Sequence, residues 1–161
     1  MTALPTYTVD VRRLEEFSAL DLYAMLKMRV DVFVVEQTCP YPELDGNDPD
    51  CLHLRLLDGA DLLACARLWR PTPDHLPRIG RVTVSPNHRG KRLGDALMRE
   101  AITECEKAYP GEAIEISAQA HLQKFYGSLG FERTSEEYLE DDIPHVDMVR
   151  PATLTAAATT R

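Results

Sequence analysis

The sequence predicts a mixed α/β domain with a central sheet of about six to seven strands and flanking helices. Three observations predict it. Short β-branched runs alternate with longer stretches of helical periodicity, their spacing is too uneven for a regular βαβ repeat, and 161 residues suffice for one core. We therefore expect a single layered domain over residues 1–150. The Ala- and Thr-rich tail at 151–161 has the low complexity that predicts disorder.

The first part of the chain predicts one strand, one helix and a long loop. Residues 7–11 alternate between apolar and polar types, as a half-buried strand does. Ser18 is a good N-cap for a helix whose apolar spacing continues to about Glu36. Three prolines and one glycine then make residues 38–49 an irregular loop.

The middle of the chain predicts a hairpin and a further strand. Residues 52–56 alternate, and the turn at 58–61 leads to a return strand at 62–69. A loop with three prolines at 71–77 separates this hairpin from a β-branched strand at 79–84. These strands therefore neighbour one another in the chain without a crossover helix.

The last part predicts two helices and three strands. Residues 93–108 carry one apolar stripe at helical spacing and are stopped by a Pro-Gly pair. A strand at 113–117 precedes a short helix at 121–129, which a glycine closes. The segments 131–134 and 145–149 are expected to form a final antiparallel pair.

Composition excludes several classes of function. The formal net charge of −8 argues against nonspecific binding to nucleic acid or to an anionic membrane. No apolar run approaches the roughly 20 residues that span a bilayer, and residues 1–12 lack the apolar core of a secretory signal. The four cysteines have no CxxC spacing, so we expect reduced thiols in a cytoplasmic protein. Cys51 and His53 lack a supporting ligand cluster, so no metal site is expected.

The most distinctive segment is a basic loop that contains two glycines and joins a strand to a helix. Pro86 ends the strand because it has no amide proton, and Gly90 and Gly94 allow a tight turn. From Arg81 to Gly94 there are four Lys or Arg residues and no acid, although the whole chain is acidic. Free amides in the first turn of the helix, next to these cations, predict a site for a pyrophosphate.

The order of elements and two sequence blocks resemble the GCN5-related N-acetyltransferase (GNAT) superfamily. The blocks are the loop Arg89-Gly90-Lys91-Arg92-Leu93-Gly94 and the segment from Gln119 to Phe131 with its Phe-Tyr-x-x-x-Gly-Phe pattern at 125–131. More narrowly, Val32–Gln37 with Cys39-Pro40-Tyr41, the stretch Ala118–Leu122 and Ile143-Pro144-His145 are similar to the bacterial ElaA-like branch. The resemblance covers residues 10 to 150.

The resemblance implies acetyl-CoA bound in the cleft between two parallel strands that splay apart. Its pantetheine arm would lie along Val82, Thr83 and Val84 through main-chain groups. Its pyrophosphate would lie on the amides of the loop Arg89–Gly94. The remaining contacts that the resemblance implies are with Gln119, Lys124, Phe125 and Tyr126.

Two positions depart from the family pattern. The pattern Arg/Gln-x-x-Gly-x-Gly/Ala has its first glycine where this chain has Arg92, and a side chain there limits how closely the backbone can wrap a phosphate. The added charge of Arg92 could compensate for that limit. Gln119 stands where many relatives have Asn, and it can make the same kind of amide contact from a longer side chain.

Acetyl transfer to an amine needs a neutral nucleophile and a donor for the leaving thiolate. The resemblance makes Tyr126 this donor, and a phenol of pKa about 10 can hydrogen-bond to a thiolate whose thiol has a pKa of about 8.5. A main-chain amide at Val82 or Val84 would polarise the thioester carbonyl. The residues leave the base open, acting directly or through water: His121 and Glu36 are the catalytic candidates beside Tyr126, and Glu115 and His145 are further ones.

The family implies that the acceptor enters beside the first helix and the loop after it. From Glu36 to Asp50 the chain has five acids and no Lys or Arg, which indicates either a solvated loop or an acidic mouth. The acidic mouth would comprise Glu36, Tyr41, Glu43, Asp45 and Asp48. It predicts a cationic primary amine as acceptor, such as a polyamine, an amino sugar or a peptide amine, bound by Glu36, Tyr41, Asp45 and His145.

The predicted function is acetyl-CoA-dependent N-acetyltransfer by direct attack in a ternary complex, and the resemblance favours a homodimer. The alternative is a noncatalytic acyl-CoA-binding sensor or interaction module on the same fold. A third interpretation, an anion-binding scaffold for another nucleotide, would leave the block at 125–131 unexplained. Only an enzyme predicts turnover that Tyr126→Phe lowers while the affinity for CoA holds.

Overall fold

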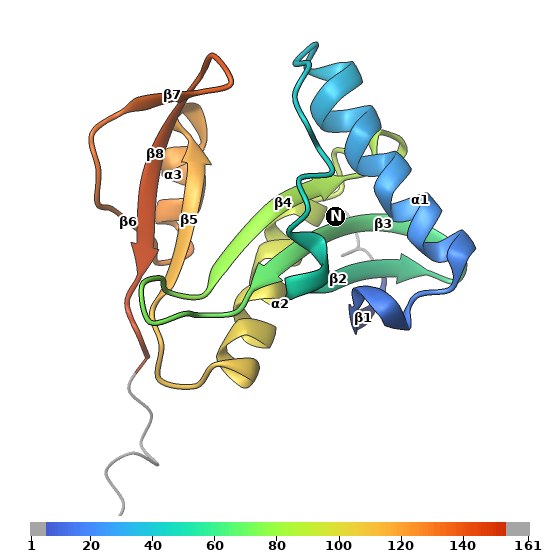
Figure 1. The fold of residues 1–161 in the computed structure, drawn as a ribbon, viewed down its shortest axis with the longest axis horizontal. Helices are drawn as coiled ribbons and strands as arrows, with labels where there is room; N and C mark the ends of the chain where they lie inside the picture. The colour runs from blue at the N-terminus through green and yellow to red at the C-terminus, as the bar shows by residue number, and fades with distance from the viewer. Residues whose placement is uncertain (1–5, 154–161) are drawn as a thin grey trace, which may run out of the picture. The chain divides into compact units, whose positions relative to one another are not determined.

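The computed structural model describes residues 6–153, whose strands form one mixed sheet flanked by helices (Figure 1). Hydrogen bonds link the strands in the order β1-β2-β3-β4-β5-β8-β6, with β7 paired to β8. The predicted fold class is confirmed, with eight strands in place of about six to seven. The chain divides into two compact units, residues 6–69 with 79–101 (unit 1) and residues 70–78 with 102–153 (unit 2). Of the tail that was predicted to be disordered, residues 154–161 lie outside the described residues.

Unit 1 is built on an antiparallel arrangement of β1 (Thr8–Arg13), β2 (Cys51–Asp58) and β3 (Asp61–Trp69). Leu54 in the middle of β2 is opposite Val11 of β1 and Ala66 of β3. The hairpin between β2 and β3 turns where the sequence predicted. Gly59 makes this turn possible because its φ of 60° is unstrained only without a side chain. β4 (Arg78–Val84) follows β3 in the sheet order.

The first helix begins at the predicted cap and ends earlier than predicted. α1 (Ala19–Val30) starts after Ser18, whose hydroxyl accepts a hydrogen bond from the amide of Asp21 at 3.1 Å. Met25 and Met28 pack on Cys65 of β3, and Phe17, Leu22, Leu26 and Leu62 surround them. From Asp31 to Glu36 the chain continues as a π-helix (η2) in place of the predicted α-helix. Such π-helical turns occur frequently at functional sites.

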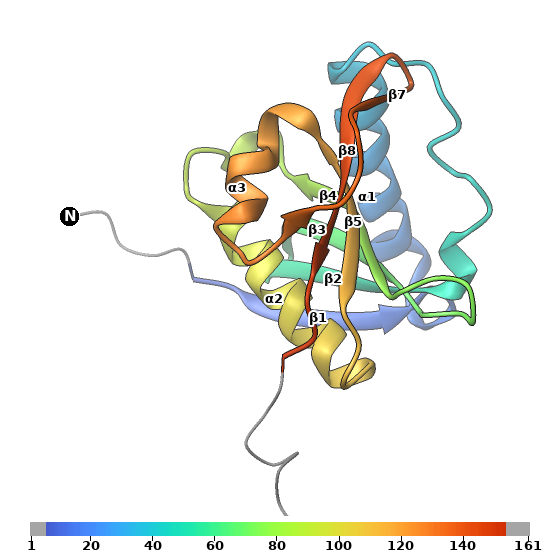
Figure 2. The ribbon, with the colours of Figure 1, turned by 90° about the vertical axis from the view of Figure 1, so that its left-hand side faces the viewer.

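The second long helix covers the sheet of unit 1 from the face opposite to α1 (Figures 1 and 2). α2 (Leu93–Ala108) buries Leu93, Leu97, Met98 and Ala101. Because helices cover both faces, every residue of β3 from Leu63 to Leu68 is buried, and this strand is nearly continuous in apolar residues. The packing therefore fixes β3 and its neighbours as a rigid support for the loop that leads into α2.

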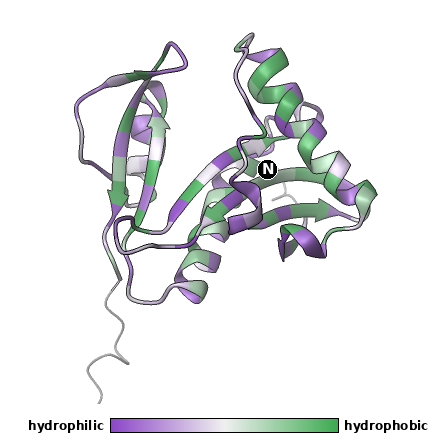
Figure 3. Ribbon diagram, viewed as in Figure 1, coloured by the Kyte–Doolittle hydropathy of each residue, from purple (hydrophilic) through white to green (hydrophobic). Residues whose placement is uncertain are grey.

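Unit 2 contains the other strands: β5 (Ile114–Gln119), β6 (Glu132–Arg133), β7 (Tyr138–Glu140) and β8 (Ile143–Arg150). Along β5, buried apolar residues alternate with half-buried polar ones, so the two faces of the strand differ (Figure 3). α3 (Gln123–Gly127) lies on one side of β5 and β8 (Figure 2). The predicted helix at 121–129 is thus shorter and is preceded by the 3-10 turn η5 (Ala120–Leu122). Strand β7 was not predicted.

Three further observations concern membrane spans, thiols and metal ligands. No helix among residues 6–153 is long and apolar enough to cross a membrane. The thiols of Cys51, Cys65 and Cys105 are buried and form no disulfide. Within the same described residues, no group of three or more His, Cys, Asp or Glu side chains is arranged to hold a metal ion.

Candidate functional site

The loop between β4 and α2 has the main-chain geometry of an anion site. After the 3-10 turn η4 (Pro86–His88), Gly90 and Arg92 adopt left-handed φ angles of 81° and 61°. Left-handed residues that alternate with ordinary ones turn successive amides toward one side, which forms a concave nest for an anion. In the described part of the chain, the amides of residues 89–95 make no recorded hydrogen bond. The loop thus offers free donors where the sequence predicted a pyrophosphate.

Arg92 occupies the position of the family's glycine and keeps a backbone conformation that glycine adopts without strain. For a residue with a Cβ this conformation costs about 1–2 kcal/mol. The departure seen in the sequence therefore leaves the path of the backbone intact. It adds backbone strain and an exposed guanidinium group at the loop.

Arg89 is the one loop cation with an ion pair recorded among residues 6–153. Its Nη1 donates to Oε2 of Glu36 at 2.8 Å, and its Nη2 donates to Oε1 at 2.7 Å. This contact ties the end of η2 to the loop. The hydrogen bonds from Arg89 also lower the pKa of Glu36, so Glu36 is a poorer base than the sequence suggested. Both side chains are more than two-fifths exposed, at 44% and 42%.

The strand that leads into the loop has an irregular backbone. Thr83 is buried and Val82 and Val84 are half-buried, so the three residues predicted to line pantetheine alternate between faces. Arg81 has a φ of 50°, which is unusual within a strand and marks a local distortion of the β-ladder. The hydroxyl of Thr83 donates to the carbonyl of Arg81 at 2.9 Å and holds this distortion.

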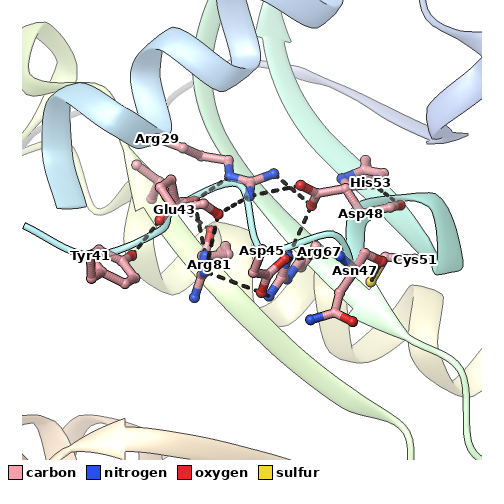
Figure 4. A network of polar contacts seen from close by, with 11 residues as sticks. Arg29, Tyr41, Glu43, Asp45, Asn47, Asp48, Cys51, His53, Arg67 and Arg81 are labelled. Carbon is pink, nitrogen blue, oxygen red and sulfur yellow. Dashed lines mark hydrogen bonds and ion pairs between the residues drawn. The ribbon is translucent and has the colours of Figure 1, made fainter. Parts of the chain in front are cut away.

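A buried network of arginines and carboxylates lies beside this strand (Figure 4). Arg29 of α1 donates its Nε to Oε2 of Glu43 at 2.7 Å and its Nη1 to Oδ1 of Asp48 at 2.9 Å. The Arg29 side chain is 1% exposed, and its two partners are 2% and 8% exposed. Ions buried this deeply are stable only when they are paired and hydrogen-bonded, as these are.

Two more arginines complete the network from the strands. Arg67 of β3 binds Asp45 through two hydrogen bonds, at 3.0 and 2.6 Å, and reaches Asp48 at 3.1 Å. Arg81 of β4 donates its Nε to Oε2 of Glu43 at 2.9 Å, and its Nη2 lies 3.4 Å from Asp45. Three arginines thus face three carboxylates, and their formal charges cancel.

The structure pairs the acids of the predicted acidic mouth with arginines. Glu43 and Asp48 are buried counter-ions, and the hydrogen bonds from Arg67 hold the pKa of Asp45 well below its usual range. The hydroxyl of Tyr41 donates to Glu43, the guanidinium of Arg81 lies 5.3 Å from the centre of its ring, and burial raises the pKa of Tyr41. The acids of the loop look solvent-exposed in the sequence because their partners lie on other elements.

The sequence analysis missed the arginines of this network. Arg29 falls on the apolar stripe of its helix, and Arg67 lies within an apolar strand. A cation at a position that should be buried requires an anion from elsewhere in the fold. That requirement was the available signal, and the acidic loop after α1 could have been assigned to meet it.

Tyr126 is the predicted donor to the leaving sulfur, and it lies in unit 2. It is 8% exposed, and its ring packs edge-to-face on Phe125 and Phe131 at centroid distances of 5.0 and 6.2 Å. Its hydroxyl makes no recorded hydrogen bond to the described residues and is not among the fully enclosed orphan atoms. Burial raises the pKa of Tyr126 to about 12. The Tyr126 hydroxyl is therefore protonated at neutral pH, and it donates to no residue of the described part of the chain.

The other predicted residues of unit 2 differ in exposure. Gln119 is half-buried at the end of β5, whereas His121 on η5 and Lys124 on α3 are exposed. His145 on β8 is 7% exposed and is paired in register with Gln119. His145 and Gln119 thus lie on one rung of the sheet, which the sequence had not indicated.

The fold and the loop define a class of protein, and the comparisons agree with it. A family model for the acetyltransferase (GNAT) domain matches residues 43–151, so the chain belongs to the GNAT acetyltransferases. Within that family it is ElaA-like. It is 44% identical to protein ElaA of Escherichia coli strain K12 over 138 residues, which is 84% of this chain and 90% of that protein.

Solved structures support the same assignment. The crystal structure of an acyl-CoA N-acyltransferase from Pseudomonas aeruginosa matches with a TM-score of 0.86 and 42% identity, over 90% of this chain and 99% of that one. The crystal structure of Escherichia coli ElaA matches with a TM-score of 0.83 and 40% identity, over the same shares of 90% and 99%. The predicted family is confirmed. Membership of it implies an acyl-CoA co-substrate and an amine acceptor.

Proposed function

We propose that this protein transfers the acetyl group of acetyl-CoA to a primary amine by direct attack in a ternary complex. The observation that carries the proposal is the loop after β4. Its unbonded amides and the exposed side chains of Lys91 and Arg92 offer an anion both hydrogen-bond donors and positive charge. A diphosphate fits that donor set, because main-chain amides at a helix start and adjacent cations are the usual partners of phosphates.

The proposed coenzyme contacts follow the family pattern. The pyrophosphate is assigned to the loop Arg89–Gly94, and the pantetheine arm to the main chain of β4 at Val82, Thr83 and Val84. Half-burial of Val82 and Val84 supports this assignment, since a strand that must accept a ligand cannot be fully enclosed. The further proposed contacts are Gln119, Lys124, Phe125 and Tyr126.

The reaction forms one C–N bond and breaks one C–S bond. The amine nitrogen attacks the thioester carbonyl, and the sulfur leaves as a thiolate. We assign a main-chain amide of Val82 or Val84 to the carbonyl oxygen, where it stabilises the negative charge that develops. Holding both reactants in one complex supplies the proximity that makes the step effectively unimolecular.

Tyr126 is assigned to the leaving sulfur. With the pKa of the phenol near 12 and that of the thiol near 8.5, complete proton transfer is uphill by about 3.5 units, or about 5 kcal/mol. The phenol therefore acts first by donating a hydrogen bond that strengthens as the C–S bond breaks. A desolvated donor without an internal partner supports this role, because no hydrogen bond must be broken first.

We propose that the acceptor is a primary amine. Residues 36–50 do not select it by its charge. Glu36 and Asp45 each bind an arginine, and Tyr41 donates to Glu43. These three predicted acceptor residues therefore make their hydrogen bonds to other residues of the protein. His145 is the predicted acceptor residue that makes no such contact with an arginine or with Glu43, and His121 and His145 both stay candidates for the base.

The test is an acceptor screen that follows free thiol release from acetyl-CoA with spermidine, glucosamine, lysine and glycylglycine. We expect turnover with at least one of these amines. Tyr126→Phe should then lower kcat by about 100-fold, as loss of a general acid does, with the Kd for CoA within about twofold of wild type. Tyr23→Phe is the matched control, because Tyr23 is 67% exposed on α1.

Two outcomes would contradict the proposal. Absence of binding between CoA and the wild-type protein at millimolar concentration, measured by calorimetry, would refute the assignment of the loop. Binding of CoA without turnover on any amine of the panel would favour a noncatalytic acyl-CoA sensor over an enzyme.

A further inference from the structure

The tautomer of His145 is fixed by the backbone of β8. Nδ1 of its ring lies 2.7 Å from the carbonyl oxygen of Ile143. A carbonyl oxygen only accepts hydrogen bonds, so Nδ1 carries the proton, and Nε2 of the neutral ring is left with a lone pair. The His145 side chain is 9% exposed, so bulk water competes little for that lone pair.

Neighbouring side chains hold the imidazole of His145 in place. The imidazole stacks on the ring of Tyr138, with centroids 6.1 Å apart and an interplanar angle of 25°. The hydroxyl of Tyr138 donates to Oδ1 of Asp147 at 2.6 Å and accepts from the hydroxyl of Ser117 at 2.5 Å. Side chains from β5, β7 and β8 thus fix the platform under His145. Support of this kind is what a base needs in order to meet its proton at a defined position.

One carboxylate lies next to Nε2 of His145. Oε2 of Glu140 lies 3.6 Å from Nε2. Both atoms are acceptors when the ring is neutral, so no hydrogen bond joins them until Nε2 receives a proton. On the elements packed against β8, the groups nearest in register are Tyr138 and Glu140 on β7 and the neutral Gln119 on β5. The other titratable groups are Asp147 and Arg150 on β8, Glu115 on β5, His121 on η5, and Glu132 and Arg133 on β6, which pairs with the far end of β8.

The register of unit 2 brings His145 next to the proposed acyl arm. His145 pairs directly with Gln119, so one interstrand spacing of about 4.8 Å separates it from a residue assigned to the pantetheine. From Gln119 the chain continues through η5 into α3, which carries Tyr126. Unit 2 therefore contains a donor that stays protonated and an oriented imidazole with a free acceptor atom.

We propose that His145 is the base of the reaction and that Nε2 is the accepting atom. The inference rests on the proposed function. The amine arrives as an ammonium ion and gives one proton to Nε2, which makes it a neutral nucleophile. As the C–N bond forms, the C–S bond breaks and its electron pair stays on the sulfur. The nitrogen then gives its second proton to this thiolate, which Tyr126 holds by a hydrogen bond, and CoA leaves as the thiol. The imidazolium, held by Glu140, returns its proton to solvent.

The test compares His145→Asn with wild type. Asparagine keeps an N–H near the position of Nδ1 for the carbonyl of Ile143 but has no atom at Nε2. With acetyl-CoA and each panel amine that the wild type acetylates, kcat at pH 7 should fall about 100-fold or more. The deficit should shrink about tenfold per pH unit as the free amine becomes more abundant, and the Kd for CoA should not change. His75→Asn is the matched control, since His75 is exposed in the turn at Thr72–His75.

Three results would overturn the proposal. A loss of kcat that is equal at every pH would make His145 a structural residue. A higher KM for the amine with unchanged kcat would make it a binding residue. A ring protonated at Nε2, detected by ¹⁵N NMR of the wild-type protein labelled at histidine, would remove the acceptor atom.

The NMR measurement needs neither an acceptor nor a folded variant. It therefore tests the geometry even if His145→Asn does not fold. If the wild type acetylates no amine of the panel, the proposed function fails as well. If the wild type is active and His145→Asn keeps its rate and its pH profile, only the assignment of the base fails.

Discussion

Two substitutions at Arg92 separate the effect of its strained backbone from the effect of its side-chain charge. Its φ of 61° strains any residue with a Cβ, and its exposed side chain belongs to the loop whose amides are free. Arg92→Gly removes the strain and the charge together, whereas Arg92→Ala removes the charge and keeps the strain. The two variants should therefore differ in stability and agree in affinity for CoA.

The expected sizes follow from the backbone geometry. Relief of a left-handed conformation is worth about 1–2 kcal/mol, and the greater freedom of glycine in the unfolded chain removes about 0.5–1 kcal/mol of that gain. Arg92→Gly should thus be more stable than Arg92→Ala by about 0.5–1 kcal/mol, which raises Tm by about 1–4 °C for a chain of this length. Both variants should bind CoA about fivefold more weakly, which corresponds to about 1 kcal/mol for one exposed charge-assisted contact.

Calorimetry measures both quantities. Scanning calorimetry of the free proteins gives the stability difference, and titration with CoA at two salt concentrations gives the affinity and its electrostatic share. Equal Tm values for Arg92→Gly and Arg92→Ala would refute the argument from strain. Unchanged CoA affinity in both variants would refute the assignment of the Arg92 side chain to the phosphates.

Two other predictions concern the buried network and the dependence of stability on pH. Glu43→Gln removes the charge that pairs with Arg29 and Arg81, so the free energy of unfolding in urea should fall by about 3–5 kcal/mol. The exposed Glu15→Gln is the control and should lower it by at most about 0.5 kcal/mol. Similar losses in both variants would contradict the burial argument. Burial lowers the pKa of His53 from 6.5, so on acidification the unfolded chain binds a proton before the folded protein does. The free energy of unfolding should therefore begin to fall below about pH 6.5, and His53→Gln should remove this loss. The hydrogen bonds from Arg67 lower the pKa of Asp45 from 3.8, so a second loss should follow below about pH 4 in both proteins; stability that is constant down to pH 3 would contradict these assignments.

Local signals predicted most of the fold because the structure uses them directly. Ser18 caps α1, and the turn at 58–61 joins β2 to β3, since a cap and a tight turn depend only on neighbouring residues. The π-helix η2 was not predicted, because its apolar residues fit the spacing of an α-helix as well. Strand β7 was missed because three residues in an acid-rich segment carry no strand pattern, and only pairing with β8 makes them a strand.

In the candidate site, too, local features could be predicted and long-range contacts could not. The anion loop could be predicted because its glycines, cations and helix start are contiguous in the sequence. Buried arginines signal that acids must come from elsewhere in the chain, but the sequence does not show which acid pairs with which arginine, because Arg67 is 22 residues from Asp45 and Arg81 is 38 residues from Glu43. Long-range pairing is decided by the fold, and a charge run read by itself is indistinguishable from a solvated loop.

The buried network also bears on the strand that is proposed to hold the pantetheine arm. Arg81 has a left-handed backbone next to Val82, a conformation that costs of order 1–3 kcal/mol and persists only when its surroundings over-determine it. Glu43 and Asp45 bind the Arg81 side chain, and Thr83 binds its carbonyl, so both ends of the residue are fixed. Two acids that the sequence assigned to the acidic mouth, Glu43 and Asp45, therefore hold the distortion in β4, the strand that we propose for the pantetheine arm.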